Sequence, residues 1–104
     1  METFNDVISG DRLVLVDFFA TWCQPCKMMH PILTQVKEAL GDRLRIIKVD
    51  VDKHGATASQ YHIQSVPTLM LFSKGEVLWR TSGVLSKEEL LATLDPFMND
   101  RYGL

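Results

Sequence analysis

The chain has few cysteines, no cluster of basic residues and no long apolar run, and each absence argues against a class of protein. Two cysteines in 104 residues are too few, and too close together, for a small secreted fold held by disulfides. A net charge of −2 without clustered lysine or arginine argues against nucleic acid as a partner. No apolar run approaches the ~20 residues of a membrane-spanning helix, so we expect no membrane association.

The N-terminal residues, Met1 to Asp6, show no basic segment followed by an apolar stretch. We therefore expect no signal peptide, and a cytoplasmic location. Thr3 and Asp6 instead form a capping box for a short helix. Hydrophobic residues make up 46% of the chain and charged residues 23%, a balance typical of globular proteins. The length favours one domain over residues 1–104.

The first half of the chain has the pattern of a strand, a helix and a second strand. Residues 13–19 form a nearly unbroken apolar run, which suits a strand buried on both faces. Residues 23–40 carry apolar side chains at helical spacing, and Gly41 stands where a helix-ending glycine belongs. Residues 44–51 form a second β-rich run, whereas residues 55–61 give only a weak helical signal. The order implies a right-handed crossover between two parallel strands.

The second half predicts a hairpin followed by a helix. Residues 68–72 and 77–81 have the composition of two strands, and Lys74 and Gly75 between them can form a tight turn. A capping box that begins at Ser86 then predicts the start of the last helix. We therefore predict an α/β fold in which a βαβ unit and a ββα unit share one mixed sheet.

The strongest functional pattern lies where the first strand should end and the long helix should begin. Trp22, Cys23, Gln24, Pro25 and Cys26 follow one another there. A helix N-terminus carries a partial positive charge and free N–H groups, which stabilise a thiolate, the nucleophile of disulfide exchange. A proline in the first helical turn loses no hydrogen bond. The pattern therefore predicts dithiol–disulfide chemistry.

A metal site is the alternative for the same residues. Cys23, Cys26 and His30 give three potential zinc ligands, but a structural zinc site needs four, normally as two pairs. His54 and His62 have no partner at a suitable spacing. We favour the redox interpretation and expect no metal, and no cofactor beyond a redox-active Cys23–Cys26 disulfide. Two ordinary buried cysteines are the least favoured interpretation.

Two charged residues interrupt the predicted apolar strands. Asp17 is either solvated near the end of its strand or a buried proton acceptor behind Cys26, and we favour the second because perturbed carboxylates gather at functional sites. Lys48 is either the positive neighbour of Asp17 or a lysine whose stem is buried and whose ammonium reaches water. The residue pattern does not separate these two interpretations of Lys48.

Two further residues have ordinary explanations. Pro67 opens the third predicted strand, where the missing N–H of a proline is tolerated, and a cis peptide bond is the alternative. His30 lies within the long helix, and we expect it to be an exposed or partly buried residue and not a ligand.

Together these segments resemble the thioredoxin family, and the resemblance runs over nearly the whole chain, from about Phe4 to Phe97. The segments that carry it are Val16-Asp17-Phe18-Phe19-Ala20, Trp22-Cys23-Gln24-Pro25-Cys26-Lys27-Met28, Pro31-Ile32-Leu33, Val49-Asp50-Val51-Asp52, Val66-Pro67-Thr68-Leu69, Phe72-Ser73-Lys74-Gly75-Glu76 and Gly83-Val84-Leu85-Ser86. As a set they are far more specific than a lone pair of cysteines.

The resemblance implies a role for each residue of the site. It implies that Cys23 attacks and Cys26 resolves, that Asp17 is a buried acid with Lys48 as its partner, and that Pro67 is a cis-proline facing the disulfide. The substrate-binding surface that it implies consists of Trp22, Gln24, Pro25, Val66, Gly83 and Val84.

The implied function is a thioredoxin-type reduction of protein disulfides, with disulfide-containing proteins as substrates and thioredoxin reductase as the electron donor. The alternative is a binding or chaperone-like module that uses the fold without redox turnover, which the intact Cys23 and Cys26 disfavour. Two residues depart from the family pattern. Gln24 stands where glycine is usual, within the segment that helps to set the reduction potential, and Phe19 stands where tryptophan is usual.

A third departure lies at the N-terminus. Thioredoxins usually begin with a strand, but only three residues precede the apolar part of the first helix here, too few for a useful strand. We therefore expect a thioredoxin fold with four strands, in which 44–51 is an exposed edge, and a stability below that of a five-stranded relative; otherwise the missing strand lies upstream in a longer protein. Charged residues along this edge should discourage pairing and favour a monomer. They are Arg45, Lys48, Asp50 and Asp52.

Overall fold

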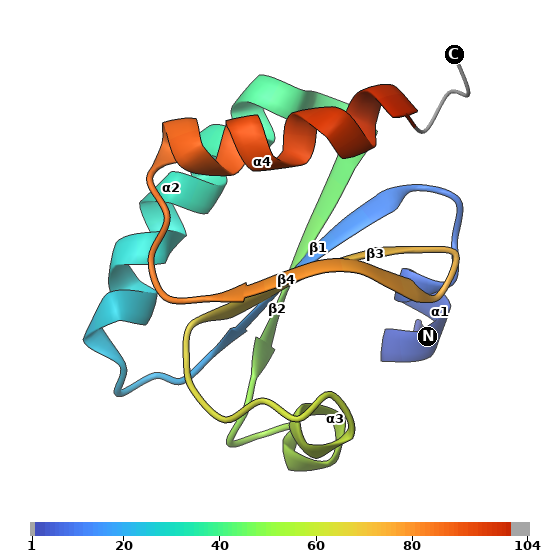
Figure 1. Cartoon of the computed structure of the whole chain (residues 1–104). Helices are drawn as coiled ribbons and strands as arrows, with labels where there is room; N and C mark the ends of the chain where they lie inside the picture. The colour runs from blue at the N-terminus through green and yellow to red at the C-terminus, as the bar shows by residue number, and fades with distance from the viewer. Residues whose placement is uncertain (1, 101–104) are drawn as a thin grey trace.

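One mixed sheet organises the chain in the computed structural model, which describes residues 2–100 (Figure 1). The elements in chain order are α1 (Phe4–Ile8), β1 (Leu13–Phe19), α2 (Gln24–Leu40), the 3-10 turn η1 (Gly41–Arg43), β2 (Leu44–Asp50), α3 (Gly55–Gln60), β3 (Thr68–Ser73), β4 (Glu76–Ser82) and α4 (Lys87–Asp100). The strand order is β2-β1-β3-β4, with β1 parallel to β2 and both other pairs antiparallel. The predicted βαβ and ββα units on one sheet are therefore confirmed.

Alternate residues of β1 supply two separate cores. Leu13 and Leu15 pack with buried residues of α2 and α4, such as Leu33 and Leu94. Val14, Val16 and Phe18 pack on the opposite face, beneath α1 and the segment around α3. Figure 1 shows α2 and α4 on one side of the sheet, with α1 and α3 on the other. A strand covered on both faces has no polar side to show, which explains its nearly continuous apolar sequence.

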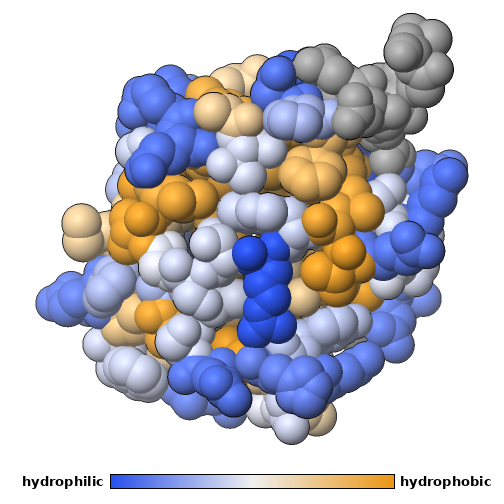
Figure 2. Space-filling model, in the orientation of Figure 1, coloured by the Kyte–Doolittle hydropathy of each residue, from blue (hydrophilic) through white to orange (hydrophobic). Residues whose placement is uncertain are grey.

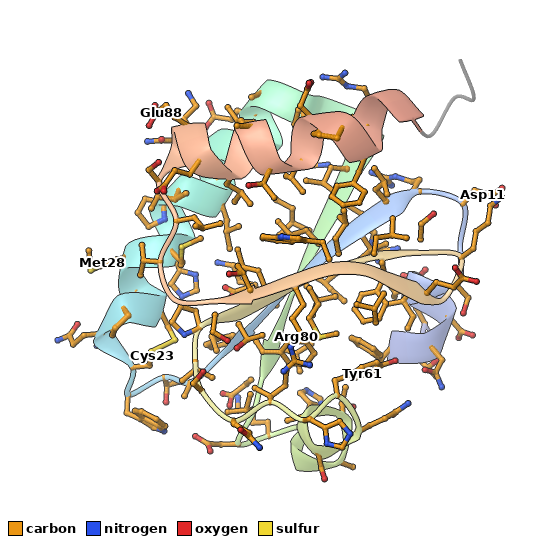
Figure 3. The ribbon with its side chains drawn as sticks, viewed as in Figure 1. Asp11, Cys23, Met28, Tyr61, Arg80 and Glu88 are labelled. Atoms are coloured by element: carbon orange, nitrogen blue, oxygen red, sulfur yellow. A yellow bond between two sulfur atoms is a disulfide. The ribbon has the colours of Figure 1, made fainter. Side chains whose placement is uncertain are left out.

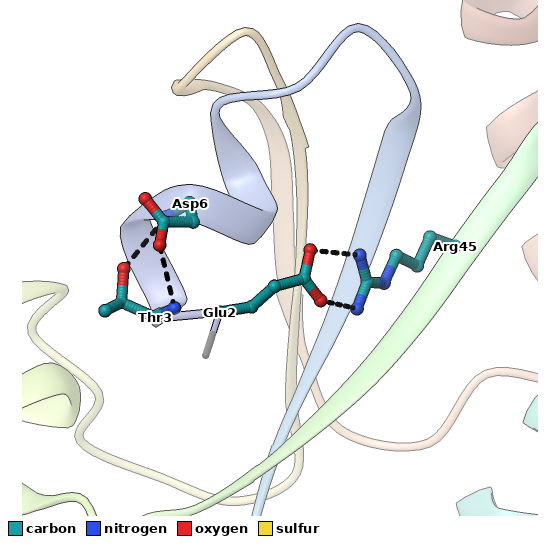
Figure 4. A network of polar contacts seen from close by, with 4 residues as sticks. All are labelled: Glu2, Thr3, Asp6 and Arg45. Atoms are coloured by element: carbon teal, nitrogen blue, oxygen red, sulfur yellow. Dashed lines mark hydrogen bonds and ion pairs between the residues drawn. The ribbon is translucent and has the colours of Figure 1, made fainter.

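Local signals in the sequence set the helix ends. Thr3 and Asp6 form the expected capping box at α1, in which each side chain accepts from the backbone of the other (Figure 4). Ser86 and Glu89 make the same reciprocal pair ahead of α4. Gly41 ends α2 with a φ of +57°, a conformation that favours glycine. These ends lie within one residue of the positions that the sequence predicts.

The hairpin between β3 and β4 also fixes the first helix. Lys74 and Gly75 both have positive φ, +53° and +82°, as the two central residues of a tight hairpin turn do. Their N–H groups donate to the carbonyl oxygens of Gly10 and Ile8, over 3.1 Å and 2.8 Å. The turn thereby closes onto the end of α1.

Both outer strands leave one edge open. No strand precedes β1 within residues 2–12, so the four-stranded sheet is confirmed and β2 is an edge. Glu2 crosses to this edge and forms a two-pronged ion pair with Arg45, over 2.8 Å and 3.2 Å (Figure 4). At the other edge, β4 exposes Val77 and Leu78, and Figure 2 shows apolar side chains on this face as separate patches among hydrophilic ones.

Replacing Lys74 by asparagine should stabilise the fold by a few tenths to about 1 kcal/mol, because asparagine tolerates positive φ better than lysine. Urea denaturation measures the change. The matched control is Lys53→Asn, which removes the same charge at an exposed residue outside the positive-φ set and should leave the free energy of unfolding nearly unchanged. Equal shifts in the two variants would contradict the explanation.

Candidate active site

The two cysteines lie at the start of α2, just after the end of β1. Cys23 is the N-cap of α2, and Cys26 stands in its first turn. They form a disulfide with their Cα atoms 5.3 Å apart, visible at the helix start in Figure 3. The backbone N–H of Cys26 donates to the sulfur of Cys23 over 3.2 Å. The sulfur of Cys23 thus occupies the place where a helix N-terminus stabilises negative charge.

The Val66–Pro67 segment faces this disulfide. The sulfur of Cys23 lies 3.6 Å from the carbonyl oxygen of Val66. The peptide bond between Val66 and Pro67 is cis, as the resemblance implies. Two hydrogen bonds hold the segment: Thr68 Oγ1 donates to the carbonyl of Ser65 over 2.8 Å, and the N–H of Gly83 donates to the carbonyl of Pro67 over 2.9 Å.

Asp17 is fully buried in the middle of the sheet. Neither of its carboxylate oxygens has a hydrogen-bond partner among the described residues. Burial raises the pKa of Asp17 from its ordinary value of 3.8 to about 6, while the charge of Lys48 acts in the opposite direction. The interpretation in which Asp17 is solvated near the strand end is therefore wrong.

Lys48 stands beside Asp17 in the β1–β2 register, but its ammonium does not bond to the carboxylate. The exposed Lys48 side chain instead reaches the Nδ1 atom of His30 on α2. Its charge still lowers the pKa of Asp17, so Lys48 acts as a positive neighbour whose ammonium lies outside the core. Among the described residues, Lys48 and Asp17 therefore do not form a direct hydrogen-bonded ion pair.

The expected binding residues Trp22, Gln24 and Pro25 adjoin the cysteines in the chain, and Val66 contacts the sulfur of Cys23. Trp22 is 70% exposed, and its indole Nε1 donates to a carboxylate oxygen of Asp52 over 3.0 Å. Gln24 and Pro25 are exposed at the start of α2, and Val84 is exposed beyond β4. A pocket of about 140 Å³ opens beside Trp22. Its lining consists of Trp22, Val51, Ile63, Gln64, Ser65 and Val66.

Several residues that contribute to the site have no role in the sequence prediction. Thr68 was expected only as the first residue of a strand, although its hydroxyl supports the turn before Pro67. Asp52 was expected only as an edge charge, and its hydrogen bond to Trp22 has no local signal. The pocket residues 63–65 belong to an irregular segment whose position depends on the fold of the whole chain.

Metal-binding clusters and membrane-spanning helices are both absent from the described part of the chain. Within residues 2–100, no group of three or more His, Cys, Asp and Glu side chains could hold a metal ion. In the same part of the chain, no helix is long and apolar enough to cross a membrane.

Comparisons with known proteins agree with this geometry. The thioredoxin family model matches residues 1–96. A thioredoxin-like protein of Synechocystis sp. is 46% identical over 96 residues, covering 91% of each chain. The thioredoxin of Acidithiobacillus ferridurans is 46% identical over 91 residues, covering 88% of this chain and 84% of its own. A solved structure described as "Structure of a malarial protein" superposes with a TM-score of 0.77 at 29% identity, covering 82% of this chain and 96% of its own.

A disulfide between two cysteines with two residues between them, at the N-terminus of a helix that follows the central strand, defines a protein-disulfide oxidoreductase. The chain belongs to the thioredoxin family. A binding module without redox turnover is not favoured, because this family match and the intact cysteine pair occur together.

Asp17→Asn should have a higher free energy of unfolding than the parent chain at pH 7. This gain should be much smaller at pH 4. Above pH 6 the parent must keep a charged carboxylate in the core, whereas below 3.8 the group is protonated in both folded and unfolded states. The stability that the raised pKa provides is thus present at low pH and lost as the pH rises through about 6. The gain in the free energy of unfolding between low and neutral pH should be on the order of 3 kcal/mol.

Denaturant unfolding at several pH values between 4 and 8 measures this effect. The control is Asp11→Asn, which removes a carboxylate at an exposed residue far from the disulfide (Figure 3). A stability gain for Asp17→Asn that does not change with pH would contradict the assignment.

Proposed function

We propose that the protein reduces the disulfides of substrate proteins by two successive thiol exchanges, with Cys23 as the attacking and Cys26 as the resolving residue. The observation that carries this order is the hydrogen bond from the Cys26 N–H to the sulfur of Cys23. A thiolate at Cys23 receives the same N–H and lies at the positive end of the α2 dipole, and both stabilise its negative charge. The resolving residue, one helical turn further on, lacks that N-cap position.

The exchange conserves sulfur atoms and electrons. The Cys23 thiolate attacks one sulfur of a substrate disulfide, forms a mixed disulfide and releases the other substrate sulfur as a thiolate. Cys26 then loses its proton and attacks the Cys23 sulfur. The Cys23–Cys26 disulfide forms, the second substrate sulfur leaves, and two electrons have passed from the protein to the substrate.

In this proposal Asp17 accepts the proton of Cys26. The supporting observations are its complete burial, its unpartnered oxygens and its raised pKa, which burial brings to about 6. A base is most effective when its pKa lies near the working pH. Lys48 contributes through its charge on Asp17, which tempers the effect of burial.

Substrate would bind across the face that carries the exposed residues of the site. The backbone of Val66 would receive an extended substrate segment as an added strand, with Pro67 holding that segment over the disulfide. Trp22, Gly83 and Val84 would flank it, and Gln24 and Pro25 would contact the side of the substrate that carries the disulfide. The pocket beside Trp22 supports this placement, because it opens next to Val66.

We further propose the setting in which this chemistry operates. The domain would span residues 1–104 and work as a monomeric electron carrier in the cytoplasm, reduced again by a thioredoxin reductase after each turnover. The bacterial relatives support this assignment. Equilibration with glutathione buffers would give the reduction potential, on which Gln24 bears directly.

Trapping experiments test the order of the two cysteines. Cys26→Ser should accumulate a covalent mixed disulfide with a protein substrate such as insulin, because the attack remains and the resolution is lost. Cys23→Ser should trap none. Non-reducing gel electrophoresis and mass spectrometry detect the adduct, and the reverse pattern would exchange the two roles.

The role of Asp17 makes a kinetic prediction. Asp17→Asn should fold normally and reduce insulin at least about 10-fold more slowly at neutral pH, because the proton of Cys26 has no acceptor. Stopped-flow measurement of the resolving step separates this loss from the initial attack. An unchanged resolving rate would remove Asp17 from the mechanism.

A further inference from the structure

The backbone of Lys48 lies beside Asp17, but its side-chain ammonium lies at His30. The two strands pair Asp17 with Lys48 in register, and in-register residues of neighbouring strands point to the same face of a sheet. This is the face covered by α2, because the pairs Leu13–Leu44 and Leu15–Ile46 of the same ladder pack against that helix. The ammonium of Lys48 nevertheless lies at the Nδ1 atom of His30.

This contact fixes the state of the His30 ring. A lysine ammonium only donates hydrogen bonds, so Nδ1 of His30 must accept and the ring must be neutral, with its proton on Nε2. The ring also packs edge-on against Phe19, with 5.8 Å between ring centroids and an interplanar angle of 71°. His30 is therefore held from two sides, by β1 through Phe19 and by β2 through Lys48.

Among the residues that the structure describes, Lys48 is the cation whose charge acts on Asp17. It comes from β2, and α2 adds the titratable His30 and the cysteines at its start. The register neighbour on β3 is the apolar Leu69, and α4 covers this face with apolar side chains. On β4, the guanidinium of Arg80 bonds to backbone carbonyls at positions 61 and 62.

We propose that His30 is a positioning residue that holds the Lys48 ammonium on α2 and so keeps the Asp17 carboxylate without a cationic hydrogen-bond partner. A carboxylate that gains an ammonium partner becomes a weaker base, whereas an unpartnered one in an apolar site stays a strong base. The hydrogen-bond assignment stands on its own. Its kinetic meaning rests on the proposed function, in which Asp17 accepts the proton of Cys26.

The pKa of Asp17 in the oxidised protein is the direct measurement. It can be followed by carboxyl ¹³C NMR, with Asp17→Asn used to assign the resonance. His30→Ala frees Lys48 to reach Asp17 and should lower the pKa by about one unit. His30→Asn is the matched control, because its side-chain oxygen can still accept from Lys48, and it should keep the pKa near that of the parent protein.

A second background separates the proposal from simple entry of water. Removing the His30 ring could also hydrate Asp17, and this would lower its pKa whether or not Lys48 is present. The proposal requires Lys48, so in the Lys48→Met background the His30→Ala change should leave the pKa of Asp17 unaltered. Hydration alone would still lower it in that background. The pKa of His30, which burial and Lys48 hold below its ordinary value, should rise in Lys48→Met.

Two results would overturn the proposal: an unchanged Asp17 pKa in His30→Ala, or a decrease that persists in the Lys48→Met background. These titrations need no substrate, so they do not depend on the role of Asp17. If Asp17 is the proton acceptor, His30→Ala should also move the acid limb of the pH profile for insulin reduction to lower pH by the same shift. Unaltered reduction by Asp17→Asn would refute that role and leave the positioning result intact.

Discussion

The burial of β1 on both faces is the constraint from which the rest of the structure follows. Its odd-numbered residues need a cover, which α2 and α4 provide, and its even-numbered residues need another, which α1 and the segment around α3 provide. Its two backbone edges are occupied by β2 and β3. β1 therefore ends at the rim of the sheet, and α2 begins there a few residues later. The cysteines stand at that rim because one is the N-cap of α2 and the other lies in its first turn.

Asp17 is the exception that this central strand tolerates. Every neighbouring position in the strand holds an apolar side chain, and none of the described residues satisfies its oxygens. Such a group lowers stability at neutral pH, and the proposed proton transfer from Cys26 supplies a reason for its presence. The surrounding apolar packing is what raises its pKa, so the residues that form the core would also tune the proposed base.

Much of the fold could be predicted because its signals are local. The apolar run of β1, the capping boxes at Thr3 and Ser86 and the glycine after α2 each act within a few residues, and the structure has them all. The position of the disulfide followed in the same way, from cysteine spacing at a helix start. The parallel β1–β2 pair followed from the order of the elements.

What the sequence could not supply was the choice between partners that lie far apart in the chain. Lys48 has both Asp17 and His30 within reach, and which of them receives its hydrogen bond depends on how α2 sits over the sheet. The bond from Trp22 to Asp52 spans 30 residues and has the same origin. Such choices are made by packing, which a linear pattern does not contain.

The hairpin turn between β3 and β4 has a consequence for the order in which the chain can acquire its structure. A five-residue helix does not persist in water without tertiary support, and α1 takes that support from late parts of the chain. Phe4 packs against Tyr61 and Phe72, and the carbonyls of Ile8, which ends the helix, and of Gly10 accept from the N–H groups of residues 75 and 74. During synthesis from the N-terminus, α1 therefore leaves the ribosome before the residues that support it, and it takes its final form only after they have followed.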